Sequence, residues 1–186
     1  EVFTPLSLVY KMIDAIPERI MRDPSSTFLD HSAGSGNFPL ALLDRLTNKY
    51  GHDREHVLHH MLYVVELMED NHKELCSKLG VATDHPHYVN ANSLKYDYNF
   101  GYPTGIEAYM SGTPSTMHGV KFSAVVGNPP YQGPSEKNCG TRQGKPPTIW
   151  CDFVCIADKV LRDDGVIVMV HPVSYTHLTL PTTEAV

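Results

Sequence analysis

Patterns typical of buried strands alternate with helical patterns along most of this 186-residue chain. Strand-like apolar runs occur at residues 27–30, 61–65, 88–90, 122–126 and 166–170. Apolar residues recur at helical spacing in residues 6–16, 37–50, 70–79 and 148–161. Because strands that alternate with helices form parallel sheets covered on both faces, we predict an α/β fold with a doubly wound, mostly parallel sheet.

Composition narrows the class of protein further. An apolar content of 41% and a charged content of 19% are ordinary for a globular protein, and the length suits one domain. No apolar run approaches the ~20 residues that span a membrane, so we predict a cytoplasmic protein with no membrane partner. A net charge of −6 is unlike that of a free-standing nucleic-acid binder. Any strong contact with DNA would need a local basic patch or a further protein.

The cysteines and histidines do not predict a metal site. Cys151 and Cys155 are four residues apart but have no second pair at zinc-binding spacing, so we expect buried free thiols. Four histidines precede the second strand-like run, and a solvated helical face explains them better than metal binding. They are His52, His56, His59 and His60.

A glycine-rich turn follows the first predicted strand, in residues 30–38. Gly34 and Gly36 would let the backbone approach a ligand closely, but the turn lacks the Lys-Ser/Thr of a phosphate-binding loop and the third glycine of a dinucleotide site. Asp30, just before the turn, suits a cationic or amine-bearing ligand. A plain structural turn is an equally good explanation of the glycines alone.

Glu66, at the end of the next strand, could accept hydrogen bonds from ribose hydroxyls or be merely an exposed charge. Together the two acids predict a cofactor that contains a nucleoside.

The sharpest motif is Asn128-Pro129-Pro130-Tyr131, directly after the fourth strand. The prolines fix φ and remove two backbone donors, which leaves carbonyls free in a stiff loop, and Asn128 adds a side-chain acceptor. Two such acceptors can hold the hydrogens of a planar amine, while Tyr131 offers a face on which a base can stack. The alternative is a proline turn that only ends a strand.

These motifs resemble those of amino-methyltransferases that act on adenine in DNA. Asn128 to Tyr131 resembles the family's catalytic signature, and residues 30–38 resemble its cofactor motif. Phe3-Thr4-Pro5 resembles an element typical of the restriction–modification branch, and residues 90–94 are similar to the segment that contacts the cofactor's adenine. The resemblance covers about residues 1–171. In three places the chain departs from the family pattern: His31 replaces a proline, Ser123 an aspartate and Asn92 an acid.

The resemblance implies a class I methyltransferase of Rossmann-like fold that uses S-adenosylmethionine and no metal. The implied cofactor-binding residues are Thr4, Pro5, Asp30, Ser32, Ala33, Gly34, Gly36, Glu66, Asn92 and Ser93. The implied catalytic residues are Asn128, Pro129, Pro130 and Tyr131.

The substrate would be double-stranded DNA, with the target adenine flipped into the site. A restriction endonuclease or a specificity domain is the expected protein partner. Lys137, Arg142 and Lys145 could contact phosphates or lie in a solvated loop.

The ends of the chain and rival activities leave further alternatives. Residues 172–182 resemble the translation of a sequencing-library adapter, so we expect 172–186 to be a non-native tail and 1–171 a partial catalytic domain that lacks its last strands; a genuine polar loop is the alternative. Glutamine side chains of proteins and amines of RNA bases are rival methyl acceptors. A scaffold or specificity subunit without turnover is a rival of a different class.

Overall fold

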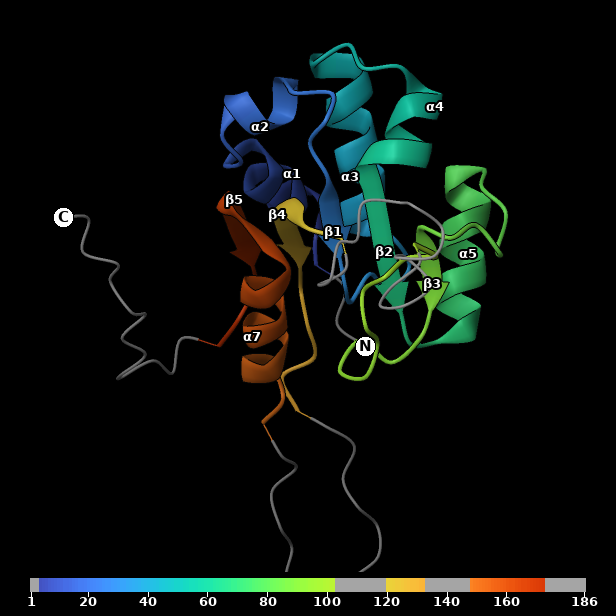
Figure 1. Ribbon diagram of the computed structural model, residues 1–186, viewed down its shortest axis with the longest axis vertical. Helices are drawn as coiled ribbons and strands as arrows, with labels where there is room; N and C mark the ends of the chain where they lie inside the picture. The colour runs from blue at the N-terminus through green and yellow to red at the C-terminus, as the bar shows by residue number, and fades with distance from the viewer. Residues whose placement is uncertain (1–3, 103–119, 133–147, 173–186) are drawn as a thin grey trace, which may run out of the picture.

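The computed structural model describes residues 4–102, 120–132 and 148–172, which form a five-stranded, fully parallel sheet with helices on both faces (Figure 1). The strands are β1 (Phe28–Asp30), β2 (Leu62–Glu66), β3 (Tyr88–Asn90), β4 (Phe122–Gly127) and β5 (Leu161–Met169). Their order in space is β3-β2-β1-β4-β5, so the direction of winding reverses between β1 and β4. Ligands of open α/β sheets bind at such a reversal, outside the carboxyl ends of the strands. The predicted doubly wound α/β fold is confirmed.

The helices follow the predicted order, with additional short turns. They are α1 (Leu6–Asp14), α2 (Glu18–Arg22), α3 (Asn37–Asp44), α4 (Arg54–His56), α5 (Glu69–Leu79) and α7 (Trp150–Val160), with π-helical turns η1 (Arg45–Lys49) and η2 (Val57–Met61). Helix α5 ends at Gly80, whose φ of 75° is the left-handed conformation that glycine adopts without strain. The helix thus ends where the predicted range of residues 70–79 ends.

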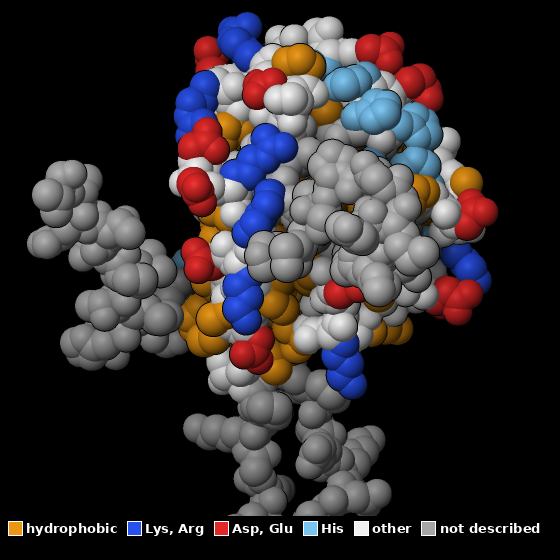
Figure 2. Space-filling view, in the orientation of Figure 1, with side chains coloured by type: hydrophobic (Ala, Val, Ile, Leu, Met, Phe, Trp, Pro, Cys, Tyr) orange, Lys and Arg blue, Asp and Glu red, His pale blue; other side chains and the backbone are white. Residues whose placement is uncertain are grey.

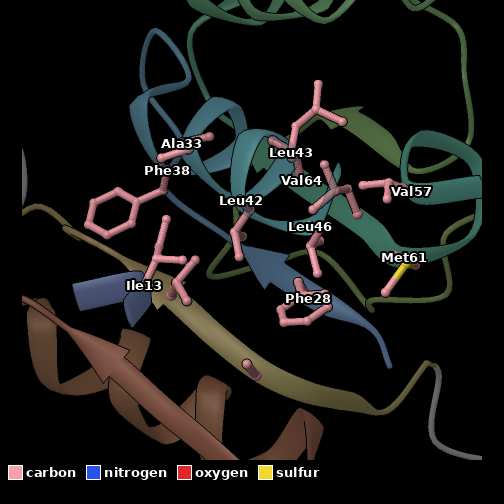
Figure 3. Packing of buried hydrophobic residues seen from close by; sticks show 14 of the residues in the cluster. Ile13, Phe28, Ala33, Phe38, Leu42, Leu43, Leu46, Val57, Met61 and Val64 are labelled. Carbon is pink, nitrogen blue, oxygen red and sulfur yellow. The ribbon is translucent and has the colours of Figure 1, made fainter. Parts of the chain in front are cut away.

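One face of the sheet packs against α1, α3 and α5. Phe28 of β1 and Val64 of β2 meet Leu42 and Leu46 in the main core (Figure 3). The apolar stripe predicted for the helix after residue 37 is confirmed, because its members are all at most 4% exposed: Phe38, Ala41, Leu42 and Leu46. This packing fixes the glycine-rich turn, which connects β1 to α3, at the carboxyl edge of the sheet.

The opposite face is covered by α7 and by residues 96–100. Leu29 and Val125 of the strands form a second core with Ala157 of α7. Tyr98 and Phe100 complete this core, although both have positive φ values, of 58° and 49°. Bulky residues rarely adopt this conformation, and residues 96–100 lie outside every strand-like or helical pattern in the sequence.

Two expectations about exposure are wrong. Leu6 begins the amphipathic helix but is 53% exposed, so the buried stripe of α1 starts at Val9. Cys155 is exposed and Cys151 is half-buried, because α7 buries only the stripe that contains Trp150, Phe153, Ala157 and Val160. Both thiols are free.

Histidines gather on the surface near α4 and η2, where Figure 2 shows them as a pale blue group. Several are bonded rather than simply solvated. His52 Nε2 lies 2.7 Å from the Met21 carbonyl, and His59 Nδ1 lies 2.7 Å from His85 Nε2. Within residues 4–102, 120–132 and 148–172, no three His, Cys, Asp or Glu side chains are grouped to hold a metal ion.

Some predictions fall outside the described residues. These concern Phe3, the cations Lys137, Arg142 and Lys145, and residues 173–186. In the part of the chain that the structure describes, no helix is both long and apolar enough to cross a membrane.

Candidate functional site at the carboxyl edge of the sheet

The predicted site residues gather beside the carboxyl ends of four neighbouring strands. Strand β1 ends at Asp30, which pairs in register with Val126 of β4. Strand β2 ends at Glu66, which pairs with Asn90 of β3. Asn92 follows β3 by two residues, and Asn128 follows β4 directly. Segments far apart in the sequence thus meet at one edge, as the parallel sheet requires.

Asp30 is a buried acid with one oxygen unused. Its Oδ1 accepts a hydrogen bond from the Ser32 backbone N–H at 3.0 Å. Among the described residues, neither Asp30 Oδ2 nor the Ser32 hydroxyl has a partner, although both atoms are buried. Burial raises the pKa of Asp30 to about 8; the nearby Glu66 charge also raises it, and the Ser32 N–H opposes the shift. An acid in this state is poised to ionise when a cationic donor arrives.

Glu66 is buried and holds the glycine-rich turn. Only 5% of the residue is exposed, which excludes the alternative of an exposed charge at a strand end. Its Oε2 accepts from the Gly34 N–H at 2.7 Å, and its Oε1 accepts from the Met68 N–H at 2.9 Å. Gly34 and Gly36 have φ values of 53° and 96°, so the turn uses the freedom of glycine at both positions. A carboxylate offers about four acceptor positions, so Glu66 retains capacity for a ligand hydroxyl.

We expect Glu66→Gln to lower the free energy of unfolding by about 1–3 kcal/mol, because one of the two backbone N–H donors would then face an amide NH₂. Urea-induced unfolding measures this loss. Glu69→Gln is the matched control, since Glu69 is exposed and forms an ion pair with Lys73 on its own helix. This variant should unfold at close to the wild-type urea concentration. Equal losses in the two variants would contradict a role for Glu66 in holding the turn.

The segment after β3 is tied to the turn after β1. The Ser93 hydroxyl donates to the His31 carbonyl at 2.6 Å, and Asn92 Oδ1 accepts from the Leu94 N–H at 3.0 Å. Burial lowers the pKa of His31 to about 4, so its ring is neutral and Nε2–H donates to the Phe153 carbonyl of α7 at 3.1 Å. His31, which stands where the family pattern has proline, therefore connects three elements of the site.

The Asn-Pro-Pro-Tyr turn is held at both ends and leaves acceptors free in its middle. The Gly127 carbonyl accepts from the Val170 N–H at 3.0 Å, and the Tyr131 carbonyl accepts from the Ile149 N–H at 3.2 Å. Asn128 Nδ2 donates to the Thr4 hydroxyl at 3.0 Å. No donor among the described residues reaches Asn128 Oδ1 or the Pro129 carbonyl. Tyr131 is 41% exposed, so its ring is accessible to a planar partner.

The acid of β1 and the turn of β4 are in direct contact through Gly127. A Cβ built on this residue would lie 2.9 Å from Asp30 Oδ1 and 3.1 Å from the Ser32 hydroxyl, and the φ of Gly127 is +148°. Only glycine fits such an approach without displacement. The predicted cofactor residues and the predicted catalytic turn therefore belong to one site.

Sequence reasoning missed Leu67 and Met68, which follow Glu66 directly. They are 61% and 56% exposed, among the most exposed large apolar residues that the structure describes. Apolar side chains beside a polar site suit the flat face of a ring. The sequence feature that could have revealed these two residues is the apolar run of β2, which continues beyond Glu66 instead of ending there.

The chain matches a family model described as Eco57I restriction-modification methylase, over residues 44–182. The matched range includes Glu66, Asn92 and Asn128 to Tyr131, while the glycine-rich turn precedes it. No curated protein matches the chain.

Three solved structures show the same fold. A modification subunit ascribed to a type I restriction enzyme of Vibrio vulnificus YJ016 is 16% identical, with a TM-score of 0.53 over 86% of this chain and 30% of its own. The M protein of the type I restriction enzyme EcoKI is 19% identical, with a TM-score of 0.52 over 87% of this chain and 32% of its own. A type I restriction-modification methyltransferase subunit from Streptococcus thermophilus is 19% identical, with a TM-score of 0.57 over 91% and 34%.

This chain therefore spans about a third of the length of those three structures. The likeness to these structures establishes the fold of the chain, and the family match establishes its family membership. The chain belongs to the Eco57I restriction-modification methylase family.

Proposed function

We propose that this protein transfers a methyl group from S-adenosylmethionine to the exocyclic N6 amine of adenine in DNA, within a restriction–modification system. The observation that carries the proposal is the contact between Gly127 and Asp30, where a Cβ would lie 2.9 Å from the carboxylate. It joins a site suited to a cationic cofactor to a turn suited to an amine. Membership of a restriction-modification methylase family supports the same activity.

The residues at the edge fit S-adenosylmethionine. Asp30 Oδ2 and the Ser32 hydroxyl are buried and unpartnered among the described residues, as a site for an ammonium group requires. Glu66 would hold the ribose, Asn92 and Ser93 would border the adenine, and Thr4 and Pro5 would close over the methionine half. Alongside Asp30 and Ser32, the turn residues Ala33, Gly34 and Gly36 would also border the methionine half. When bound, the cofactor supplies an electrophilic methyl group on a sulfonium centre.

The chain's own residues would orient the nucleophile. Asn128 Oδ1 and the Pro129 carbonyl would each accept one hydrogen of the adenine amine, which turns its lone pair toward the methyl group. Pro129 and Pro130 keep the acceptors in place because their φ angles are fixed. Tyr131 would stack on the flipped base, which is typically worth ~1–3 kcal/mol. Catalysis of this kind depends on alignment rather than on a strong base.

DNA is the substrate that the family supports best, and double-stranded DNA would present its adenine by base flipping. Solved structures of similar fold include subunits of restriction–modification systems. A restriction endonuclease or a specificity domain is therefore the partner that we propose.

Methyl transfer tests this proposal. Purified protein at a concentration equal to that of the substrate is incubated with labelled S-adenosylmethionine and unmethylated genomic DNA or single-stranded DNA. Digestion to nucleosides and mass spectrometry should then detect N6-methyladenine. We expect Asn128→Ala to slow the transfer about 10²–10³-fold, as the loss of one positioned polar contact does in other enzymes.

Asn48→Ala is the matched control. Asn48 is exposed, and its side chain donates to Asp44 within its own helical segment, so this variant should transfer methyl groups at the wild-type rate. The same assay is run with RNA and with a protein extract as methyl acceptors. Labelling confined to RNA bases or to glutamine side chains would replace the DNA assignment with that rival. Cofactor binding without transfer to any of the three would favour the scaffold subunit.

A further inference from the structure

We infer that Thr4 is a positioning residue for the methyl acceptor, because its hydroxyl orients the Asn128 amide. The inference rests on the proposed function and adds to it. The resemblance gives Thr4 only a place over the cofactor, whereas the structure brings its side chain to the catalytic turn, 124 residues away in sequence.

The hydrogen bond holds the Asn128 amide with its carbonyl end directed away from Thr4. Asn128 Nδ2 donates to Thr4 Oγ1 at 3.0 Å. An amide has its donor and its acceptor on opposite branches, so a bond at Nδ2 leaves Oδ1 directed away from Thr4. No described donor occupies Oδ1. In this orientation, the carbonyl branch that must accept an amine hydrogen is free for the substrate.

Thr4 is itself held in place by the cofactor turn. It is only 8% exposed, and its backbone carbonyl accepts from Asn37 Nδ2 at 3.1 Å. Asn37 is the first residue of α3 and follows Gly36 directly. A continuous path of hydrogen bonds therefore runs from the start of α3 through Thr4 to Asn128. This path joins the residues proposed to hold the cofactor to the residue proposed to hold the amine.

The effect of losing this bond should be larger on the rate of transfer than on cofactor affinity. Thr4→Val keeps the shape of the side chain but removes the hydroxyl, so Asn128 is free to rotate. A misplaced catalytic group costs on the order of 10–100-fold in rate. Cofactor affinity should fall by a smaller factor than the rate, because valine keeps the shape of the side chain that would close over the methionine half.

The first experiment measures the hydrogen bond without activity. Nuclear magnetic resonance of ¹⁵N-labelled protein should show a shifted and faster-exchanging Asn128 side-chain amide in Thr4→Val and a near-native one in Thr4→Ser, which retains the hydroxyl. Asn128→Ala identifies the resonance. Thr83→Val is the control, since Thr83 is exposed and precedes β3 at the opposite edge of the sheet. An Asn128 amide that is unchanged in Thr4→Val would overturn the inference, whatever the protein methylates.

The second experiment separates rate from binding. Single-turnover methyl transfer and calorimetric titration of S-adenosylmethionine are compared for wild type, Thr4→Val and Thr4→Ser. A slow Thr4→Val with near-normal cofactor affinity, rescued by Thr4→Ser, supports the positioning role. A loss of affinity that accounts for the whole loss of rate would make Thr4 a cofactor contact only. If the wild-type protein transfers no methyl group, the proposed function is wrong. The resonance experiment would still show whether Thr4 holds the Asn128 amide.

Discussion

Affinity for S-adenosylmethionine should rise about tenfold per pH unit between about pH 5.5 and 7.5, and this rise should disappear in Asp30→Asn. The pKa of Asp30 is about 8 in the ligand-free protein, mainly because of burial. The carboxyl group is therefore protonated below pH 8, and a cationic ligand must displace that proton to pair with it. Calorimetric titration in buffers of different ionisation enthalpy should show release of about one proton near pH 7.

The free energy of unfolding of the ligand-free protein should fall as pH rises, whereas its affinity for the cofactor should increase. The pKa of Asp30 is raised from 3.8 to about 8 on folding. Between these two pH values the folded state binds one more proton than the unfolded state. The stabilisation that this proton gives the folded state is lost as pH rises through 8. Asp30→Asn removes this ionisable group, so at pH 8 the variant should unfold at a higher urea concentration than wild type although it binds the cofactor more weakly. Asp163→Asn, at an exposed position near the amino end of β5, should change neither property. Affinity that is independent of pH would contradict the assignment of Asp30.

Gly127→Ala should abolish cofactor binding and methyl transfer together. The new Cβ would lie 2.9 Å from Asp30 Oδ1 and 3.1 Å from the Ser32 hydroxyl. Both the acid and the catalytic turn must then shift, and a displacement of about 1 Å at such a site can cost 10²-fold in rate. The positive φ of Gly127 adds backbone strain of order 1–3 kcal/mol. Calorimetric titration and urea-induced unfolding measure the two effects.

Gly51→Ala is a control that adds the backbone strain of a positive φ without a close contact of the new Cβ. Gly51 also has a positive φ, of +75°, but a Cβ there meets nothing within 4 Å. This variant should lose stability by about 1–2 kcal/mol and bind S-adenosylmethionine normally. If Gly127→Ala also bound the cofactor normally, the close approach of β4 to Asp30 would have no functional meaning.

The sequence predicts the parts of this fold that local pattern controls. β2 and β4 are continuous apolar runs, and the stripe from Phe38 to Leu46 follows helical spacing, so each has one favourable way to be buried. Local pattern also places Asp30, Glu66 and Asn128 at one edge, because parallel strands share the direction of their carboxyl ends. It does not predict the π-helical turn of Arg45–Lys49 or the early start of β5 at Leu161. These features depend on packing between distant segments rather than on their own residues.

The contacts that make the edge a site are beyond local pattern for the same reason. The bond from Gly34 to Glu66 spans 32 residues, and the bond from Asn128 to Thr4 spans 124. Nothing in the sequence near Thr4 indicates a partner so far along the chain. The unpaired Oδ2 of Asp30 is likewise visible only when all its neighbours are in place.

The reversal of strand order between β1 and β4 divides the proposed site into two continuous stretches of chain. Residues 4–93 supply everything proposed to hold the cofactor, and residues 120–132 supply the acceptors for the amine. Apart from the pairing of β1 with β4, the contacts that join the two at the site are few, chiefly Gly127 against Asp30 and Asn128 to Thr4. We therefore expect mutations after β4 to change the choice of the proposed methyl acceptor while the proposed donor site stays intact. New substrate preferences could then evolve, or be engineered, on an unchanged cofactor half.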